Sequence, residues 1–162
     1  MLFEALAALQ NLEPVAALRA SRWAYPLVNT AHIVGLALLF GAILPLDLRL
    51  LGAWRDVPLP QLSRALLPVA MAGLALAAAS GLMMFAVSAT KYAATPVFLL
   101  KLALIAAAVA NALLLRLSRH WTLARVPELD HPPAARLKLA AGLSLALWLA
   151  VILCGRFIAY LA

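Results

Sequence analysis

Long uncharged stretches alternate with short polar connections along the chain. A transmembrane helix needs roughly 20 apolar residues to cross the hydrocarbon core of a bilayer. Four windows of about this length are present, at residues 23–46, 65–88, 96–116 and 137–161. Lys101 and Arg156 are the charges that lie inside these windows rather than at their edges. Because the connections are too short for an extramembrane domain, the pattern predicts an all-α polytopic membrane protein, a single membrane domain (residues 1–162) built as a bundle of four transmembrane helices.

The first 22 residues form a separate segment with an amphipathic pattern. Apolar residues recur at helical spacing, at Leu2, Phe3, Leu6, Leu9, Val15 and Leu18. A signal peptide would carry a positive charge ahead of its apolar stretch, whereas this segment carries Glu4. We therefore predict an N-terminal amphipathic helix, broken in the middle, that lies along the membrane interface.

The composition also indicates a membrane protein and excludes a soluble one. Hydrophobic residues make up 67% of the chain, charged residues 12%, and the mean hydropathy is +1.02, whereas soluble domains carry about 25% charged residues. The lipid bilayer is the expected partner. The net charge of +7 would point to nucleic acid in a soluble chain, but here the basic residues lie between apolar windows, so we expect no nucleic-acid partner. The single cysteine, Cys154, excludes an internal disulfide and multi-cysteine zinc or iron–sulfur sites.

The distribution of Lys and Arg predicts the orientation of the bundle. Eight of them lie in the first and third connections, namely Arg49, Arg55, Arg64, Arg116, Arg119, Arg125, Arg136 and Lys138. The opposite side holds Arg19, Arg22 and Lys91, together with Lys101 and Arg156 if these two extend outward to the interface. Because cytoplasmic loops are enriched in Lys and Arg, both termini are predicted on the outer, periplasmic side of the membrane.

Polar and small residues share faces of the predicted helices. In the first window, Tyr25, Asn29 and His32 fall at i, i+4 and i+7, and a polar stripe of this kind is expected to face protein rather than lipid. In the second window, small residues recur every three or four positions on one face, at Gly73, Ala77, Ser80 or Gly81, with Met84 following. This second pattern predicts a close helix–helix contact.

His32 is the first candidate for cofactor chemistry. A neutral imidazole inside a membrane is a good ligand for haem iron or copper, and ionisable residues inside membranes are functional by default. The alternative is a histidine hydrogen-bonded to Asn29 or to a neighbouring helix. Met84 is a second candidate metal ligand, with ordinary packing as its alternative.

Two cations are predicted at a depth similar to that of His32. Lys101 would serve as an axial ligand, pair with a haem propionate, or extend its amine to the interface. Arg156 suits a propionate or another acidic group. The alternative, as for Lys101, is a side chain that extends its charged group to the membrane interface. A soft donor set of His32, Met84 and Cys154 would instead hold copper.

An acidic residue ends the first window. Asp47 is expected at the depth of Arg116 and Arg119, at the inner end of the bundle. The sequence therefore predicts an ion pair that fixes the helix ends.

Several short motifs resemble known membrane families. An uncharacterised family of small four-helix bacterial membrane proteins is similar at Ser21 to Trp23, Tyr25 with Pro26, His32, Gly35, Gly41 and residues 47–52. More distantly, the chain resembles HemJ-type protoporphyrinogen oxidases and the membrane domain of CopD-type copper-resistance proteins. The HemJ-type resemblance rests on His32, Phe40, Gly41, Arg49, Gly81-Leu82 and Lys101-Leu102. It implies haem b binding at His32 and Lys101, whereas the polar Asn-Glu-Pro segment of the fourth helix in those oxidases is absent here.

These observations lead to one main hypothesis and two alternatives. The main hypothesis is a bacterial inner-membrane protein that holds haem b in the outer half of its bundle, with His32 as axial ligand, Lys101 or Met84 as the second ligand, and Arg156 at a propionate. Electron transfer to a quinone or a periplasmic redox protein would be its task. The alternatives are a cofactor-free subunit or scaffold of a larger membrane complex or homo-oligomer, and a copper-handling protein that uses His32 and Met84.

Overall fold

The computed structural model describes residues 1–119, 121 and 134–161. All of its described secondary-structure elements are α-helices, as predicted. In chain order they are α1 (Leu2–Gln10), α2 (Glu13–Ala20), α3 (Ala24–Leu51), α4 (Leu59–Val87), α5 (Ala89–Ala93), α6 (Pro96–Leu117) and α8 (Ala135–Leu161).

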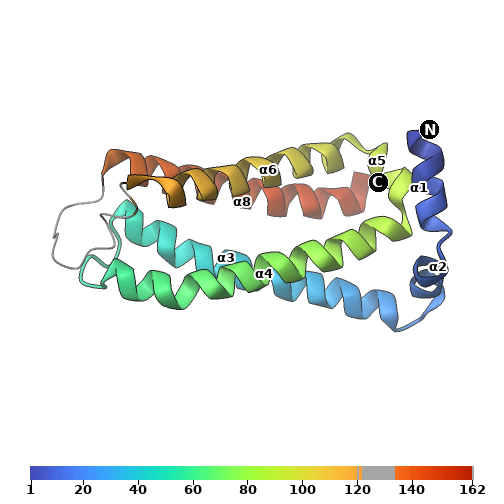
Figure 1. The fold of residues 1–162 in the computed structure, drawn as a ribbon, viewed down its shortest axis with the longest axis horizontal. Coiled ribbons are helices and arrows are strands. Elements are labelled where there is room, and N and C mark those ends of the chain that lie inside the picture. Colours follow the sequence, from blue (N-terminus) through green and yellow to red (C-terminus); the bar gives the residue numbers. More distant parts are fainter. Residues whose placement is uncertain (120, 122–133, 162) are drawn as a thin grey trace.

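Four of these helices, α3, α4, α6 and α8, are long and apolar enough to cross a membrane. They run antiparallel to one another in sequence order, so that α1 and the last turns of α8 lie at the same end of the bundle (Figure 1). We call this end, which also holds α2 and α5, the α1 end, and the opposite end, which holds the α3–α4 connection, the loop end. The prediction of a four-helix membrane bundle is confirmed.

The first two spans extend beyond the charge-free windows at the loop end. Helix α3 continues past residue 46 to Leu51, and α4 begins at Leu59 instead of residue 65. The absence of charge marks the apolar part of a helix, whereas the residues at which the helix begins and ends depend on backbone conformation. Gly52 ends α3 in the left-handed conformation, φ 117°, a conformation that glycine adopts without steric cost, and Pro60 lies in the first turn of α4.

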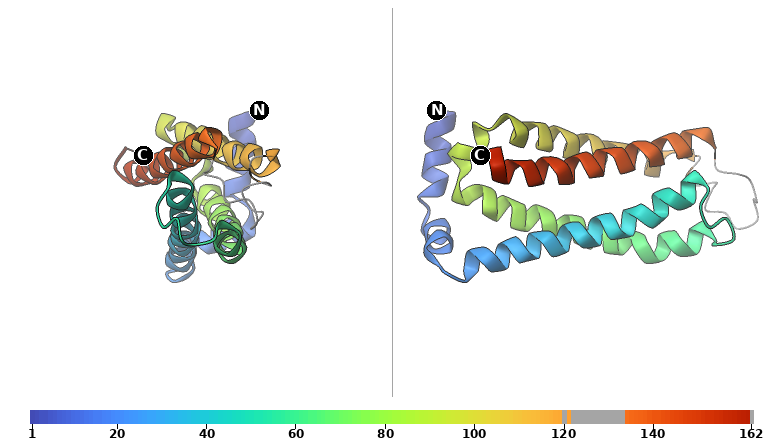
Figure 2. Two further views of the ribbon diagram at one scale, coloured as in Figure 1. Left: turned by 90° about the vertical axis from the view of Figure 1, so that its left-hand side faces the viewer. Right: turned by 180° about the vertical axis from the view of Figure 1, so that it is seen from behind.

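The N-terminal segment forms two short helices that lie across the α1 end of the spans (Figure 2). Helix α1 contacts α4 and α5, and α2 contacts α3 and α4. The side chain of Gln10 fastens this junction, because its amide nitrogen donates to the carbonyl oxygen of Val87 at 3.5 Å and its amide oxygen accepts from the Thr90 hydroxyl at 3.2 Å. The break predicted in the amphipathic segment falls between Gln10 and Glu13.

The spans pack as two close pairs, α3 with α4 and α6 with α8, and α3 also contacts α8. Glycine allows α3 and α4 to approach. A β-carbon at Gly35 would lie 2.6 Å from the backbone nitrogen of Ala77, and one at Gly73 would lie 2.5 Å from that of Leu39. The small-residue face predicted for the second window is thus the contact with α3. In the other pair, the Asn111 amide donates to the carbonyl oxygen of Ala140 at 3.0 Å.

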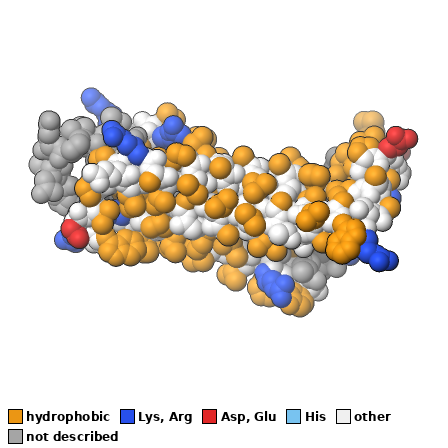
Figure 3. Space-filling model, turned by 90° about the horizontal axis from the view of Figure 1, so that it is seen from below, with side chains coloured by type: hydrophobic (Ala, Val, Ile, Leu, Met, Phe, Trp, Pro, Cys, Tyr) orange, Lys and Arg blue, Asp and Glu red, His pale blue; other side chains and the backbone are white. Residues whose placement is uncertain are grey.

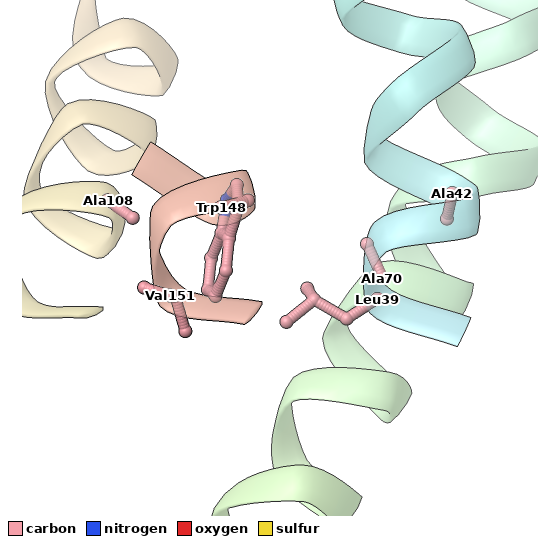
Figure 4. Close-up of a cluster of buried hydrophobic side chains, with 6 residues drawn as sticks. All are labelled: Leu39, Ala42, Ala70, Ala108, Trp148 and Val151. Carbon is pink, nitrogen blue, oxygen red and sulfur yellow. The ribbon is translucent and has the colours of Figure 1, made fainter. Parts of the chain in front are cut away.

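Two apolar clusters form the core. The one near the middle contains Leu39, Ala42, Ala70, Ala108, Trp148 and Val151, and Figure 4 shows Leu39 reaching from α3 towards the Trp148 ring on α8. The other, towards the loop end, contains Leu46, Leu50, Leu59, Trp121, Leu137 and Ala141. On the face shown in Figure 3, hydrophobic side chains cover the length of the bundle while most charged side chains lie towards its ends. This distribution suits a bilayer around the spans.

Candidate ligand cavity

A cavity of about 350 Å³ lies between the four spans, in the half of the bundle nearer the α1 end. Its wall is mostly apolar, and His32 and Lys101 are its two ionisable residues. The residues that line it are His32, Leu36 and Leu39 of α3, Leu74, Ala77, Ala78, Gly81, Leu82 and Phe85 of α4, Phe98, Lys101, Leu102 and Ile105 of α6, and Trp148 and Val151 of α8. Apolar walls with a few convergent polar groups are typical of cofactor sites.

The His32 ring is oriented by the backbone of α4. Its Nδ1 lies 2.8 Å from the carbonyl oxygen of Ala77 and 3.2 Å from the Ser80 hydroxyl oxygen. A carbonyl oxygen can only accept, so Nδ1 carries the hydrogen and donates it. The Ser80 hydroxyl gives its own hydrogen to the carbonyl oxygen of Leu76 at 2.6 Å. The neutral imidazole therefore has its lone pair on Nε2, and no described residue donates a hydrogen bond to that atom.

Each ionisable residue of the cavity lies against a glycine of a neighbouring helix. A β-carbon at Gly81 would lie 3.0 Å from Cε1 of His32. A β-carbon at Gly155 of α8 would lie 3.5 Å from the amine nitrogen of Lys101. The Lys101 side chain therefore crosses from α6 towards α8 inside the bundle instead of extending to the interface.

The cavity opens sideways between α4 and α6. These two helices share no extended contact in the described part of the chain, unlike the α3–α4 and α6–α8 pairs. Leu82 of α4 and Leu102 of α6 line the cavity and are nevertheless 69% and 47% exposed, respectively. Both belong to helices that are long and apolar enough to span a membrane, so an opening on this side of the bundle is compatible with access from lipid.

Aromatic rings close the cavity towards the α1 end. Phe85 of α4 stacks on Phe98 of α6, with ring centroids 5.4 Å apart, and Tyr92 of α5 stacks on the same ring at 5.5 Å. Tyr92 also hydrogen-bonds with Tyr25, and burial together with that neighbour raises the pKa of Tyr92 above its ordinary value. The phenol is therefore neutral, as a ring stack against phenylalanine favours.

The structure brings together two of the five predicted cofactor residues, His32 and Lys101. Met84 is partly buried on α4 but does not line the cavity, and neither does Cys154. Met84 and Cys154 therefore do not share the cavity with His32, and copper binding by this set stays a prediction. Arg156 is exposed near the α1 end, where its guanidinium donates to the Tyr160 hydroxyl at 2.8 Å and lies 5.1 Å from the centre of that ring.

The inward-facing stripe predicted on the first helix needs a correction at Asn29, which is exposed and does not line the cavity. Asn29 precedes His32 by three positions, and at about 100° per residue this leaves the two side chains about 60° apart around the helix. Tyr25, seven residues before His32, returns to within about 20° of it and is partly buried. The hydrogen-bond partner of His32 is accordingly α4, not Asn29.

The ion pair expected at the loop end is also absent among the described residues. Asp47 is buried in the bundle, with the Ser144 hydroxyl as its hydrogen-bond partner, and Arg116 and Arg119 are exposed. Sequence reasoning also missed the roles of Trp148, Phe98 and Gly155. Phe98 offered a usable signal, since it lies three residues before Lys101 and thus near the same helix face.

Comparison with known proteins adds no further constraint, because no protein-family model, curated protein or solved structure matches the chain.

Proposed function

We propose that this membrane protein binds haem b in the cavity, with His32 as an axial ligand, and exchanges electrons with a quinone or a redox protein. The observation that carries the proposal is the hydrogen bond from Nδ1 of His32 to the carbonyl oxygen of Ala77. Metal-ligating histidines almost always donate their other ring hydrogen to such a partner, which fixes the tautomer and the ring orientation. His32 is prepared in this way, with Nε2 left for a metal.

The cavity wall suits a flat, mostly apolar macrocycle. Its volume of about 350 Å³ falls within the range of small-molecule and cofactor sites, and its open side between α4 and α6 leaves room for a larger ring to extend towards lipid. Haem supplies a one-electron couple when bound. The chain would contribute ligation by His32, an apolar environment that excludes water, and the Lys101 amine as a second ligand or a propionate partner.

The residues of the HemJ-type resemblance also support the proposal. His32, Gly81, Leu82, Lys101 and Leu102 come from three helices, and all five line the cavity. Phe40, Gly41 and Arg49 of the same resemblance do not. The part of the motif that meets at one place thus includes His32 and Lys101, the two residues at which the resemblance implies haem binding.

The location of the site follows from the proposed orientation. We infer that the α1 end faces the periplasm, because the connections of the loop end hold most of the Lys and Arg residues. The cavity then lies in the outer half of an inner membrane. Its opening towards lipid gives a membrane-dissolved quinone direct access to the haem edge.

The test is an absorption spectrum of the protein purified in mild detergent from a haem-replete host, oxidised and then reduced with dithionite. We expect a Soret band and a reduced b-type band at one haem per chain, and their loss in His32→Ala. The matched control is His131→Ala, which changes a histidine of the third connection and leaves the spectrum intact. A colourless wild-type protein without metal by elemental analysis would overturn the proposal and favour a cofactor-free subunit.

A further inference from the structure

A second polar site is buried in the bundle, on the loop-end side of the cavity. Asp47 of α3 is 5% exposed. The Ser144 hydroxyl of α8 is its hydrogen-bond partner, and its Oδ2 has no partner among the described residues. Ionisable groups inside membrane bundles are costly to bury and mark functional sites by default.

The described basic residues of the loop end do not pair with Asp47. Arg49, on the same helix, donates instead to the carbonyl oxygens of Val57 at 2.7 Å and Arg55 at 2.9 Å. The other described cations of this end are Arg55 in the α3–α4 connection, which donates to the carbonyl oxygen of Gly52 at 3.3 Å, Arg64 on α4, Arg116 on α6, Arg119 after α6, and Arg136 and Lys138 on α8. Within the described part of the chain, none of them forms an ion pair with Asp47.

A second unpartnered group lies on α8, one turn beyond Ser144. Trp148 of α8 is 4% exposed, and no described residue accepts a hydrogen bond from its Nε1. Trp148 follows Ser144 by four residues, so the two side chains are neighbours on one face of α8. Trp148 also lines the cavity of His32 and Lys101. Asp47, Ser144 and Trp148 therefore form a buried row that leads from the loop end to the cavity.

We propose that Asp47 is a proton-binding site, whose carboxyl group takes up one proton (RCOO⁻ + H⁺ → RCOOH) and exchanges it through a buried water that joins Oδ2 to the indole N–H of Trp148. An ionised carboxylate without a cation is far costlier in an apolar interior than a neutral acid, so such groups are neutralised by a proton. The bridging water would satisfy both unpartnered atoms, as buried waters commonly do.

The chemistry of the row favours a proton over a metal ion. Hard cations such as Ca²⁺ need six to eight oxygen ligands, whereas the row offers the carboxyl group and one hydroxyl. The indole N–H is a donor and would point a positive hydrogen at a cation. The described residues contain no group of three His, Cys, Asp or Glu side chains that could hold a metal.

Infrared spectroscopy of the purified protein in liposomes tests the proposal, with or without haem. We expect the carbonyl stretch of a protonated carboxyl group at neutral pH, a downshift of this band in D2O, and its loss in Asp47→Asn. The control Asp56→Asn removes an exposed carboxyl group of the same end and should leave the band unchanged. If Asp47→Asn fails to fold, Asp47→Glu should move the band instead of abolishing it.

Trp148→Phe tests the connection to the cavity. It removes the indole N–H and keeps an aromatic ring, so we expect a shift of the carboxyl band and slower exchange in D2O. The proposal is overturned if the wild-type protein shows no protonated-carboxyl band at neutral pH, if the band survives Asp47→Asn, or if it does not respond to D2O. Each readout is independent of the Soret band, so it remains interpretable if haem binding fails.

Discussion

Gly81 of α4 faces the edge of His32 that donates to the α4 backbone. A β-carbon at Gly81 would lie 3.0 Å from Cε1 and 3.3 Å from Nδ1 of His32. Such contacts are tighter than ordinary van der Waals packing, so any side chain at this position pushes the imidazole away from the carbonyl oxygen of Ala77. The absence of a side chain at Gly81 thus sets the orientation of the proposed ligand.

Gly81→Ala should therefore weaken haem binding. The displaced ring loses its fixed orientation, and loss of such a supporting interaction typically lowers metal affinity by about 10- to 100-fold. Haem titration followed at the Soret band measures the change. Gly41→Ala is the control, because a β-carbon at Gly41 meets no atom within 4 Å while the gain in helix propensity is the same. Equal haem affinity in the two variants would contradict the assigned geometry.

Lys101→Leu separates the two roles proposed for the Lys101 amine. Leucine keeps an apolar side chain, removes the amine and, unlike methionine, has no atom that can ligate iron. If Lys101 is an axial ligand, we expect haem to stay bound through His32 with a changed spin state. If it pairs with a propionate, we expect weaker binding with an unchanged spin state. Lys91→Leu, which alters an exposed lysine of α5, is the control. A spectrum and affinity equal to those of the wild type would exclude both roles.

The sequence predicted the convergence of His32 and Lys101 because burial in a membrane allows few alternatives. An ionisable group within a long apolar helix must turn towards the bundle or reach the interface, and His32 is too short to reach it. The rotation of each helix was harder to predict, since an error of about 60° moves a residue such as Asn29 out of the interior.

Features that depend on pairs of helices were not accessible from the sequence. The opening between α4 and α6 exists because α3–α4 and α6–α8 form the close pairs, and a hydrophobicity pattern does not specify which helices are neighbours. Asp47 illustrates the same point. Its position directly after the apolar window suggested an ion pair at the membrane interface. The rotation of α3 instead turns the Asp47 carboxyl group towards Ser144 of α8.

Gly35→Leu should destabilise the bundle by separating α3 from α4. Even the first atom of a side chain at Gly35 would lie 2.6 Å from the Ala77 nitrogen, and the conflicting atoms belong to the backbone. Overpacking typically costs about 1–3 kcal/mol, and a backbone clash places this variant at the upper end. Unfolding in mixed detergent micelles, followed by circular dichroism, measures the loss. Gly142→Leu on α8, where a β-carbon meets nothing within 4 Å, should change stability much less, and a similar loss in both variants would contradict the predicted contact.

Cysteine labelling in intact cells tests the proposed orientation, starting from a Cys154→Ser background that has no other cysteine. Arg19→Cys reports on α2 at the α1 end, and Asp56→Cys reports on the α3–α4 connection at the loop end; both positions are exposed. Because the loop end carries the excess of Lys and Arg, we expect a membrane-impermeant maleimide to label position 19 in intact cells and position 56 only after permeabilisation. The two positions are each other's control, since both should react once the membrane is opened. Labelling of position 56 in intact cells would reverse the orientation and place the cavity in the cytoplasmic half of the membrane.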